Sequence, residues 1–565
     1  MEQDKTNKII HKFAIKNAYE YGSARLESVL GKVITAEPQL KLDMAALVGM
    51  IKKEVERVNL LNKEQIALEA GQFADEFKSS DAERAKRSAE HNFSIKGATK
   101  GEFITRFPPE PGGYMHIGHA KAVYIESVLK EQYSGKLMLY FDDTNPDIER
   151  QEYVDAFRED LLWLGIKFDR EYFGSDSIPI LYKYAQTAIA NNHAYVCTCD
   201  QEKIKSLRLQ GIGCEHKAQN ADSNIEMWEQ MLENKFGAGE AVVRLNSDIS
   251  SVNTMMRDPT LFRIKTTPHY RQKDKYVVWP TYDFGTPIID SMNNISDVIR
   301  GKEYEMRDPL YFAVLDMLSL KRPRITSFAE LDIENNITSK RIIREMIAQG
   351  KISGWDDPRL VTIRALKRRG IISEAIKEFS LRSGMGKSES TTSIDALLSI
   401  NKRLLIKTAQ SISAIKNPII LNLTGASQSN IANGIVFDAN NHAALWVDLN
   451  EIQSLKLSTK SIAVLKRSLP IKINGISNRQ IDASVEGAAP VGAATIDWIG
   501  EGIECEMWEI GNLMNKDEFN NKSIVKHRAI ISEDAAKLAK GEVINIKGIG
   551  LYCIDSTDPI RLISL

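Results

Sequence analysis

Two histidines, His116 and His119, lie three residues apart in a segment rich in proline and glycine that runs from Arg106 to Ala122. The prolines stiffen the turn, and the glycines let a ligand approach the backbone closely. A helix predicted to begin near His119 directs free N–H groups at an anion. The pattern indicates a phosphate site in which two imidazoles stabilise charge developing at phosphorus. Without the proline and glycine framing, two solvated histidines would be the preferred interpretation.

For these histidines to meet a phosphate, a strand must end and a helix must begin within the segment. The apolar runs Phe103–Phe107 and Leu137–Phe141 predict two strands, and Val123 and Val128 lie on the helix between them. Apolar residues spaced by 3, 4 and 3 from Val154 to Leu164 predict a further helix. This alternation favours a parallel sheet with helices on its faces, which places ligands at the carboxyl ends of the strands.

The sequence changes character after this α/β region. Residues 197–275 hold three cysteines and predict a mostly irregular insert. The strand-like runs Tyr276–Trp279 and Ile288–Ile289 are then expected to resume the sheet. Toward the C-terminus, short alternating runs such as Ile419–Leu423 and Ala444–Val447 predict a β-barrel region.

The composition is that of a globular protein with several domains, because 565 residues exceed what one core usually holds. Residues 1–96 contain few glycines or prolines and predict a helical region. The net charge of −1 means that a nucleic-acid partner would have to meet local basic patches. Five unevenly placed cysteines do not predict a disulfide framework, and Met1–Lys5 lacks the apolar stretch of a signal peptide. We therefore expect a cytoplasmic protein.

The histidine segment resembles the HIGH signature of class I aminoacyl-tRNA synthetases, in the extended form of the glutamyl and glutaminyl enzymes. Tyr140–Pro146 and Gly354–Arg359 are similar to two further motifs of that family and follow in the same order. The resemblance spans most of the chain. It implies an α/β multidomain protein with a Rossmann-like parallel-sheet catalytic domain, an inserted acceptor-binding domain, an N-terminal helical region and C-terminal β-barrel anticodon-binding domains. This organisation is typical of archaeal and eukaryotic-type members, whereas bacterial glutamyl enzymes have an all-helical anticodon domain.

The resemblance also gives the expected domain boundaries. They are an N-terminal helical region at 1–96, the two halves of the catalytic domain at 97–196 and 276–340, the acceptor-end-binding insert at 197–275, a helical stem-contact connector at 341–400 and the β-barrel anticodon-binding region at 401–565.

A second catalytic signature of the family, a KMSKS-like loop, is expected downstream, and Ile337–Arg341 stands at that place. Ser339 and Lys340 are its matching residues. A mobile lysine suits the loop, because its ammonium can follow the charge that accumulates on the ATP phosphates. Taken alone, a Ser-Lys-Arg triplet is usually solvated, so its pairing with the histidine segment decides the interpretation.

A rival phosphate loop, Gly384–Ser388, contains the Gly-Lys-Ser end of a Walker A motif. Leu381 stands where its leading glycine is required, and no strand is predicted before it, so we interpret the segment as an ordinary basic turn. Lys367–Arg369, Lys402–Arg403 and Lys466–Arg467 are candidate contacts for tRNA phosphates, although such clusters alone are more often solvated.

Glutamate would bring a side-chain carboxylate into a partly dry pocket, where an unpaired charge is unfavourable, so an arginine is expected there. Arg300, in the run Val298–Glu303, resembles the arginine of glutamyl enzymes, at a place where glutaminyl enzymes carry a smaller, uncharged residue. The resemblance further implies that Arg106 binds substrate carboxylate, Asp142 binds the α-ammonium and Tyr282 lines the pocket. From periodicity alone, a surface salt bridge would be favoured for Arg300.

The same resemblance implies an ATP site, with Mg²⁺ accompanying the ATP. The expected ATP-binding residues are Pro109, Gly112, His116, Gly118, His119, Ser339 and Lys340. Of these, the two histidines and Lys340 are the expected catalytic groups.

Four metal-ligating side chains, Cys197, Cys199, Cys214 and His216, lie within twenty residues and predict a closed tetrahedral zinc site. Its role would be structural, since four protein ligands leave no open position for substrate. Both ligand pairs are spaced more tightly than a C-x-x-C knuckle, and family members vary in keeping their metal. Ordinary reduced cysteines are therefore the alternative.

The predicted reaction has two steps. The α-carboxylate of L-glutamate attacks the α-phosphorus of ATP and expels diphosphate, and a terminal ribose hydroxyl of tRNA(Glu) then attacks the adenylate and releases AMP. Such chemistry depends on positioning and charge stabilisation rather than on a nucleophilic side chain.

Three alternatives to this glutamyl activity remain. They are a glutaminyl-tRNA synthetase of the same fold, a catalytically silent tRNA-binding protein and a nucleotidyltransferase that shares the histidine motif. Arg300 argues against the first, the two histidines with Lys340 and Asp142 argue against the second, and the long C-terminal β region argues against the third.

Overall fold

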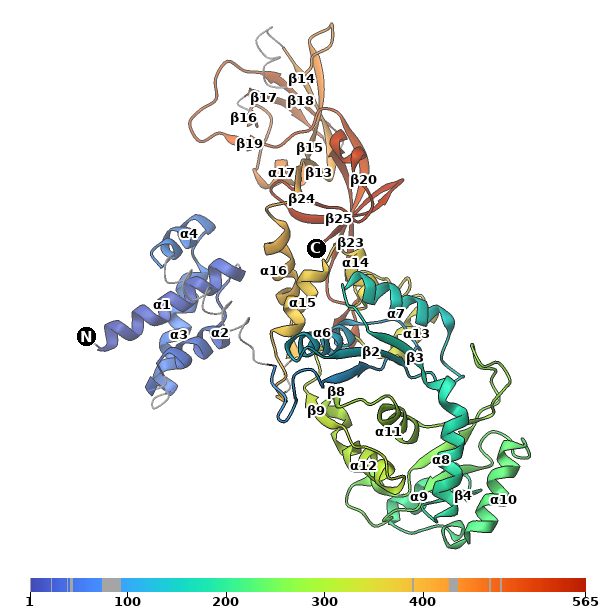
Figure 1. Ribbon diagram of the computed structural model, residues 1–565. Helices are drawn as coiled ribbons and strands as arrows, with labels where there is room; N and C mark the ends of the chain where they lie inside the picture. Colours follow the sequence, from blue (N-terminus) through green and yellow to red (C-terminus); the bar gives the residue numbers. More distant parts are fainter. Residues whose placement is uncertain are drawn as a thin grey trace. The chain divides into compact units, whose positions relative to one another are not determined.

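The computed structural model of the protein describes residues 2–21, 23–37, 39–40, 44–73, 93–388, 391–425, 435–466, 469–477 and 480–565. The chain divides into two compact units, Met1–Asn92 and Phe93–Leu565, and each is described by itself (Figure 1).

Helices form the N-terminal unit: α1 (Glu2–Tyr21), α2 (Leu26–Ala36), α3 (Met44–Asn59) and α4 (Lys63–Gly71). They enclose their own apolar core, in which Ile15, Val29, Ile51 and Val58 are fully buried. The helices predicted for residues 1–96 are therefore observed up to α4, and residues 74–92 lie outside the described residues.

A parallel sheet lies at the centre of the second unit. Its strands are β1 (Ile104–Phe107), β2 (Lys136–Phe141), β3 (Arg170–Phe173), β8 (Asp297–Gly301) and β9 (Arg324–Phe328). The strands β1, β2 and β3 pair in parallel, as do β8 and β9. The backbone N–H of Ser296 donates to the carbonyl of Ile104 at 2.9 Å and so places β8 beside β1. The order β3-β2-β1-β8-β9 reverses between β1 and β8, and such a reversal is where open α/β sheets bind ligands.

Helices connect and cover these strands: α6 (Ile117–Gln132), α7 (Gln151–Trp163), α11 (Tyr282–Met292) and α12 (Asp308–Met317). The strands predicted at Phe103–Phe107 and Leu137–Phe141 and the helix predicted from Val154 are all observed. However, α6 begins at Ile117 rather than near His119, because His116 caps it.

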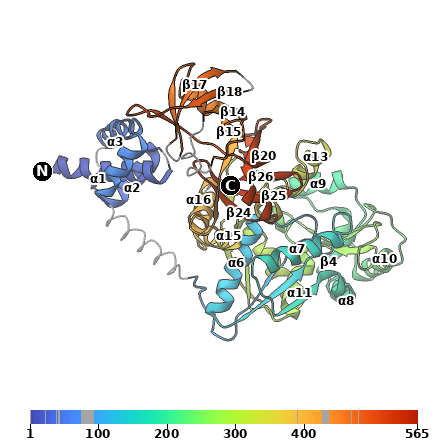
Figure 2. The same ribbon diagram turned by 90° about the horizontal axis from the view of Figure 1, so that it is seen from above.

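The region between β3 and α11 is folded, and helices and strands occupy much of residues 197–275, where a mostly irregular insert was predicted. It contains α8 (Ile178–Ala190), β4 (Ala194–Cys197), α9 (Gln201–Gln210), α10 (Ala221–Leu232), β5 (Val242–Leu245), β6 (Thr260–Ile264) and β7 (Val278–Pro280). The strands form an antiparallel sheet in the order β4-β5-β6-β7, and α8 packs beside α10 (Figure 2). The helix α9 was missed because it has no buried residue and therefore no apolar stripe.

Two apolar runs were assigned to the wrong element. Of Tyr276–Trp279, only the last two residues enter β7, which closes the antiparallel sheet of the insert instead of resuming the parallel one. Ile288 and Ile289 lie in the buried helix α11. A short apolar run fits a buried helix and a buried strand equally well, so periodicity could not separate the two.

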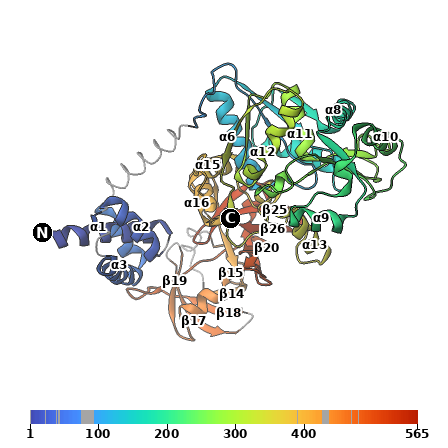
Figure 3. The same ribbon diagram turned by 90° about the horizontal axis from the view of Figure 1, so that it is seen from below.

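A connector follows β9. Its elements are β10 (Asp332–Ile333), α13 (Lys340–Ala348), α14 (Ile363–Arg368), α15 (Ser373–Leu381), β11 (Thr391–Thr392) and α16 (Ile394–Leu405). The rival phosphate loop, Gly384–Ser388, follows the helix α15 and not a strand, as the sequence predicted. The helix α13 lies beside the C-terminal region, whose residues Leu513 and Phe519 pack in one apolar cluster with Ile343 and Met346 (Figure 3).

The basic clusters of the connector are engaged within the protein rather than free. Arg368 pairs with Asp555 through two bonds of 2.7 and 2.9 Å, and the buried Arg369 donates to the carbonyl of Ser564 at 3.1 Å. Arg403 pairs with Glu378. For Arg368 and Arg369 these contacts favour anchoring of α14 to the C-terminal region over phosphate binding.

Two β-sheets form the C-terminal region. One has the order β12-β24-β25-β26-β20-β23-β13 and the other β15-β14-β18-β17-β16-β19. Their elements are β12 (Gln410–Ile412), β13 (Ala414–Lys416), β14 (Pro418–Thr424), β15 (His442–Asp448), α17 (Leu449–Ser454), β16 (Ile462–Leu465), β17 (Leu469–Ile476), β18 (Gln480–Val485), β19 (Ala494–Ile496), β20 (Gly502–Ile510), β23 (Ile524–Ser532), β24 (Val543–Ile546), β25 (Gly550–Thr557) and β26 (Ile560–Ser564), with the hairpin β21 (Met514–Asn515) and β22 (Glu518–Phe519).

Alternating burial along β14 and β15 turns one face of each strand to an apolar core, and the sheets are barrel-like, as predicted. In the third basic cluster, Lys466 pairs with Asp497, and Arg467 lies outside the described residues. Among the helices that the structure describes, none combines the length and apolar character needed to cross a membrane.

Candidate active site

A cleft of about 830 Å³ opens at the carboxyl ends of β1, β2 and β8. Its volume is sufficient for a nucleotide and a small substrate. Most of the predicted site residues line it: Arg106, Pro109, His116, Gly118, His119, Asp142, Tyr282, Arg300 and Lys340. Gly112 and Ser339 do not, although Ser339 stands between Thr338 and Lys340, which do.

The two histidines form a close pair of tilted rings at the start of α6. The Nδ1 of His116 accepts the backbone N–H of Gly118 at 3.1 Å, and the Nδ1 of His119 accepts the backbone N–H of His116 at 3.2 Å. The ring centroids are 3.8 Å apart. Because both Nδ1 atoms accept, each neutral ring carries its proton on Nε2 and can donate it to a ligand.

Both imidazoles are neutral near pH 7. Burial, reinforced by the positive charge of Lys340, lowers the pKa of His116 to about 3. Burial, His116 and Lys340 hold the pKa of His119 well below its usual value. The pair therefore offers hydrogen-bond donors to a phosphate and adds no charge of its own.

Lys340 brings the second predicted motif to the first. Its Nζ lies 3.1 Å from both the carbonyl oxygen and the Oε2 of Glu110, which is 230 residues away in the sequence. The stem of the lysine crosses Gly113, where a Cβ would lie 3.0 Å from the Lys340 Cδ. A glycine at this position lets the lysine reach the histidine segment.

Arg106 is fully buried and only partly paired. Its Nε donates to Asp290 at 2.8 Å, and Tyr311 donates to the other oxygen of Asp290 at 2.8 Å. Its Nη1 and Nη2 atoms are buried and have no hydrogen-bond partner in the described part of the chain. The guanidinium thus presents two donors, the geometry that a carboxylate accepts.

Arg300 is also buried, so the surface interpretation is wrong. Its side chain is 5% exposed, its Nη1 donates to the hydroxyl of Tyr282 at 2.9 Å, and its Nη2 contacts Asp308. Its Nε is buried and unpaired among the described residues. Tyr282 thus contacts Arg300 directly and lines the same cleft as Arg106.

Asp142 follows β2 at the edge of the cleft. Its backbone N–H donates to the carbonyl of Pro109 at 3.1 Å, which ties it to the histidine segment. Burial raises the pKa of this carboxyl to about 6, and the negative charge of Glu110 adds to the shift. An incoming ammonium would be a favourable partner for it.

Sequence reasoning missed the counter-ions Asp290 and Asp308. Each stands eight residues after a predicted site residue: Asp290 follows Tyr282 on α11, and Asp308 follows Arg300. Eight residues return to the same face of a helix, so the position of Asp290 could have been suspected from Tyr282.

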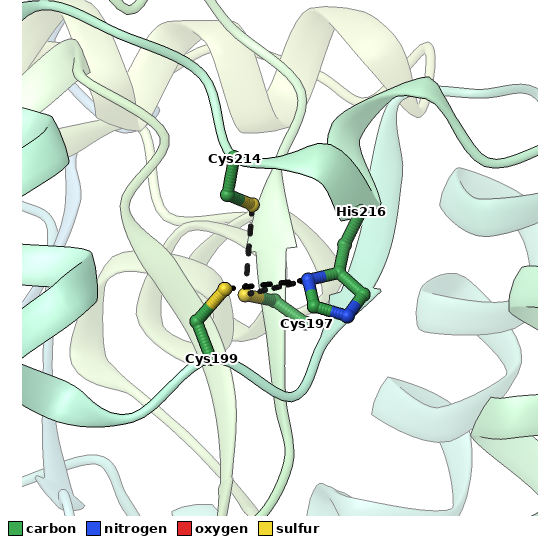
Figure 4. Close-up of side chains that lie close together, drawn as sticks. All are labelled: Cys197, Cys199, Cys214 and His216. Atoms are coloured by element: carbon green, nitrogen blue, oxygen red, sulfur yellow. Dashed lines mark hydrogen bonds between the residues drawn. The ribbon is translucent and has the colours of Figure 1, made fainter.

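The four predicted metal ligands come together in the insert (Figure 4). The ligand atoms of Cys197, Cys199, Cys214 and His216 all lie within 4.8 Å of one another. Cys197 Sγ is 3.7 Å from Cys214 Sγ, and Cys199 Sγ is 3.4 Å from His216 Nδ1.

The surroundings of the cluster favour a metal. Thr198 Oγ1 lies 2.9 Å from His216 Nε2 and orients the ring so that Nδ1 faces the sulfurs. Arg244 donates to Cys214 Sγ at 3.6 Å. Three thiols and an imidazole at these separations suit tetrahedral Zn²⁺, with outer contacts of the kind that zinc ligands make.

Comparison with known proteins gives the family. Residues 102–406 match the family described as tRNA synthetases class I (E and Q), catalytic domain. A glutamate–tRNA ligase of Nitrosopumilus maritimus is 34% identical over 556 residues, which is 96% of this chain and 96% of the relative. The chain belongs to the glutamate–tRNA ligases. The resemblance that the sequence showed is thereby confirmed.

Other similar proteins agree in name. The glutamate–tRNA ligase of Pyrococcus furiosus is 31% identical over 574 residues, 99% of either chain. Among solved structures, the glutamate-tRNA synthetase of Elizabethkingia anophelis matches with a TM-score of 0.40 and 19% identity, over 55% of this chain and 71% of that chain.

Replacing His119 tests the phosphate site. We expect His119→Ala to slow adenylate formation by roughly 100- to 1,000-fold, the usual effect of losing one transition-state donor, with little change in the KM for glutamate. The rate of adenylate formation is measured by diphosphate exchange into ATP, with glutamate and tRNA present. The exposed His193 supplies the control variant His193→Ala, which should behave like the parent. Unchanged turnover of His119→Ala would contradict the role.

The pKa of Asp142 predicts an acid limit to activity. A carboxyl with a raised pKa is ionised only above that value, so kcat/KM for glutamate should fall as the pH drops below about 6. Neither histidine should contribute, since both are already neutral there. At every pH, kcat/KM for glutamate should be lower in Asp142→Asn than in the parent, and it should not fall further below about pH 6. If kcat/KM of Asp142→Asn still falls at acid pH, the fall must come from the titration of another group.

Proposed function

We propose that this ligase activates L-glutamate with ATP in the cleft of about 830 Å³ and transfers it to the 3′ end of tRNA(Glu), releasing AMP and diphosphate. One observation carries the substrate assignment. The buried Arg106 and Arg300 line the same cleft as Tyr282, the histidine pair and Lys340. Two buried cations beside a phosphate-binding segment fit an acidic amino acid next to ATP.

In the proposed first step, Asp142 binds the α-ammonium of glutamate while Arg106 and Arg300 bind its side-chain carboxylate. The α-carboxylate then attacks the α-phosphorus of ATP. The two Nε2–H donors of His116 and His119 would bind phosphate oxygens, and Lys340 would neutralise charge on the leaving diphosphate. Mg²⁺ bound with the ATP would supply further charge neutralisation.

Transfer requires the 3′ end of the tRNA to reach the same cleft. A second cleft of about 880 Å³ in the insert is lined by the cations Lys205, Arg208, Arg257, Arg263 and Lys265. It shares Arg208, Thr260 and Arg263 with the first cleft. Its positive lining suits a phosphate backbone. We propose that the acceptor end of tRNA(Glu) occupies it.

We propose that Cys197, Cys199, Cys214 and His216 hold a structural Zn²⁺. Bound there, the metal would join β4 to the turn that follows α9 and so stiffen the wall of the second cleft, which Cys199 also lines. The cytoplasmic location stays a prediction.

Arg300 carries the proposed choice of glutamate over glutamine. Its guanidinium can hold a carboxylate by charge-assisted bonds, whereas an amide offers it only one acceptor. We expect Arg300→Ala to reduce the preference for glutamate by about 3–5 kcal/mol, the range for removing one partner of a buried pair. The measurement compares activation of glutamate and glutamine, with tRNA present, in parent and variant.

The matched control for Arg300→Ala is Arg322→Ala, which removes an exposed arginine paired with Asp316 and should leave the preference unchanged. If the preference of Arg300→Ala for glutamate over glutamine stays within about tenfold of that of the parent, a difference of roughly 1.4 kcal/mol, Arg300 does not select the substrate.

Metal analysis should find about one zinc per chain. Cys199→Ser should lower that content and reduce the charging of tRNA more than it reduces adenylate formation, because the cluster borders the second cleft and not the first. Cys505→Ser, which alters a buried thiol outside the cluster, is the control. Metal-free protein with full activity and unchanged stability would rule out the zinc site.

A further inference from the structure

Glu126 is a buried carboxyl in the active-site cleft to which neither the sequence nor the proposed mechanism gives a role. It lies on α6, almost two turns beyond His119, and is 1% exposed. Its Oε2 is buried without a hydrogen-bond partner among the described residues. It lines the same cleft as Arg106, whose Nη1 and Nη2 atoms are also buried and unpaired.

Buried polar atoms without partners are rare, and each needs an explanation. Here two guanidinium nitrogens and a carboxyl oxygen, from two residues that line one cleft, have no hydrogen-bond partner in the described part of the chain. If the Glu126 carboxyl and the Arg106 guanidinium served only to pair with each other, a hydrogen bond would join them. The arrangement instead suits an occupant that bonds to both, and a carboxylate is a group that Arg106 can hold with two donors.

We propose that Glu126 is a specificity-determining residue that, in its protonated form, donates a hydrogen bond to the side-chain carboxylate of the substrate glutamate. This inference rests on the proposed function and adds to it a third contact beside those of Arg106 and Arg300. The geometry that carries it is the unpaired, buried Oε2 in the cleft.

The balance of charge in the cleft agrees with a neutral Glu126. Arg106 is paired with Asp290, and Arg300 is paired with Asp308. These four groups cancel before any substrate enters. An ionised Glu126 would add a negative charge near Arg106 and oppose a second carboxylate, whereas a protonated Glu126 leaves the attraction of the two arginines intact.

The surroundings of Glu126 keep its proton in place. Burial raises the pKa of this carboxyl well above its usual value, and the nearby Asp290 acts in the same direction, against the opposing effect of Arg106. The other charged or titratable groups on α6 and on the elements packed against it are His119, Lys121, Tyr124, Lys130, Glu131, Lys136, Tyr140, Asp297, Arg300, Glu374, Lys377 and Glu378. Within the described chain, none of them shifts the pKa of Glu126.

Protonation gives Glu126 a preference between glutamate and glutamine. A carboxylic acid donates one hydrogen bond, and a carboxylate accepts it more strongly than an amide oxygen does. An ionised Glu126 would act in the opposite sense, because it would repel a carboxylate and accept a bond from the amide group of glutamine. The protonated side chain therefore reinforces the selection attributed to Arg300.

Two replacements separate this role from a structural one. Glu126→Gln keeps a neutral donor of the same shape, and Glu126→Ala removes it. At pH 7 we expect the KM for glutamate to stay within about threefold of the parent in Glu126→Gln and to rise roughly tenfold or more in Glu126→Ala, with kcat little changed in both. Glu131→Gln, an exposed residue on the same helix, is the matched control and should behave like the parent.

A pH profile supplies a readout that packing alone would not move. In the parent, the KM for glutamate should rise on the alkaline side as Glu126 ionises, and this rise should be absent from Glu126→Gln. Aminoacylation of tRNA(Glu), measured from pH 6.5 to about 9.5 for parent and variant, tests it. Because the α-ammonium of glutamate titrates equally with both proteins, only the difference between their profiles counts.

Several outcomes would overturn the inference. One is a Glu126→Ala protein with the KM of the parent. Another is a Glu126→Gln protein as impaired as Glu126→Ala, which would mean that the ionised form is required. A third is an alkaline rise shared by the parent and Glu126→Gln. If Glu126→Ala fails to fold, the comparison of Glu126→Gln with the parent still decides. In all these cases the parent would still charge tRNA(Glu), whereas failure of the proposed function would appear as a parent that does not.

Discussion

The site depends on one buried pair, in which Asp290 fixes the Nε of Arg106 at 2.8 Å and leaves the other two nitrogens of the guanidinium unpaired. A buried cation without a counter-ion is strongly unfavourable, and a fully paired one would have little to offer a substrate. Asp290 is 184 residues away from Arg106, on the helix that follows the insert. The chain must therefore return from the insert and place α11 beside β1 before the cleft can form. The Arg106–Asp290 pair therefore constrains both the fold of this domain and the formation of its cleft.

The histidine side of the cleft follows a different principle. Burial keeps the imidazoles of His116 and His119 neutral, so they contribute oriented donors, and Lys340 contributes a positive charge beside them. The backbone fixes the orientation, because the N–H groups of His116 and Gly118 occupy both Nδ1 atoms. The same N–H groups belong to the first turn of α6, where they would otherwise lack partners. Capping of the helix and selection of the tautomer are thus achieved by the same two hydrogen bonds.

Local chemistry could be predicted from the sequence, and partners distant in the chain could not. The strand, turn and helix around His116 were predictable because proline, glycine and apolar spacing act over a few residues. Arg106 and Arg300 could be proposed only through family resemblance, and their counter-ions Asp290 and Asp308 were missed. Spacing along α11 can place Asp290 on the same face as Tyr282, but it does not show that this acid pairs with Arg106, which is 184 residues away. The helix α9 was missed for a related reason: it buries no side chain, so its sequence carries no stripe that distinguishes it from a loop.

The two arginines differ in how firmly their counter-ions are held, and this difference suggests how a carboxylate enters. Asp290 is fully buried and also accepts from Tyr311, so it cannot turn to water when the substrate binds. Asp308 stands at the start of α12 with its side chain 31% exposed. Rehydrating a partly exposed carboxylate is far less unfavourable than stranding a buried one. We infer that Arg106 keeps its partner and binds the substrate with its unused nitrogens, whereas Arg300 can exchange Asp308 for the substrate carboxylate. A neutral amide cannot replace the charge of Asp308, so this exchange favours glutamate over glutamine even though both arginines are paired at rest.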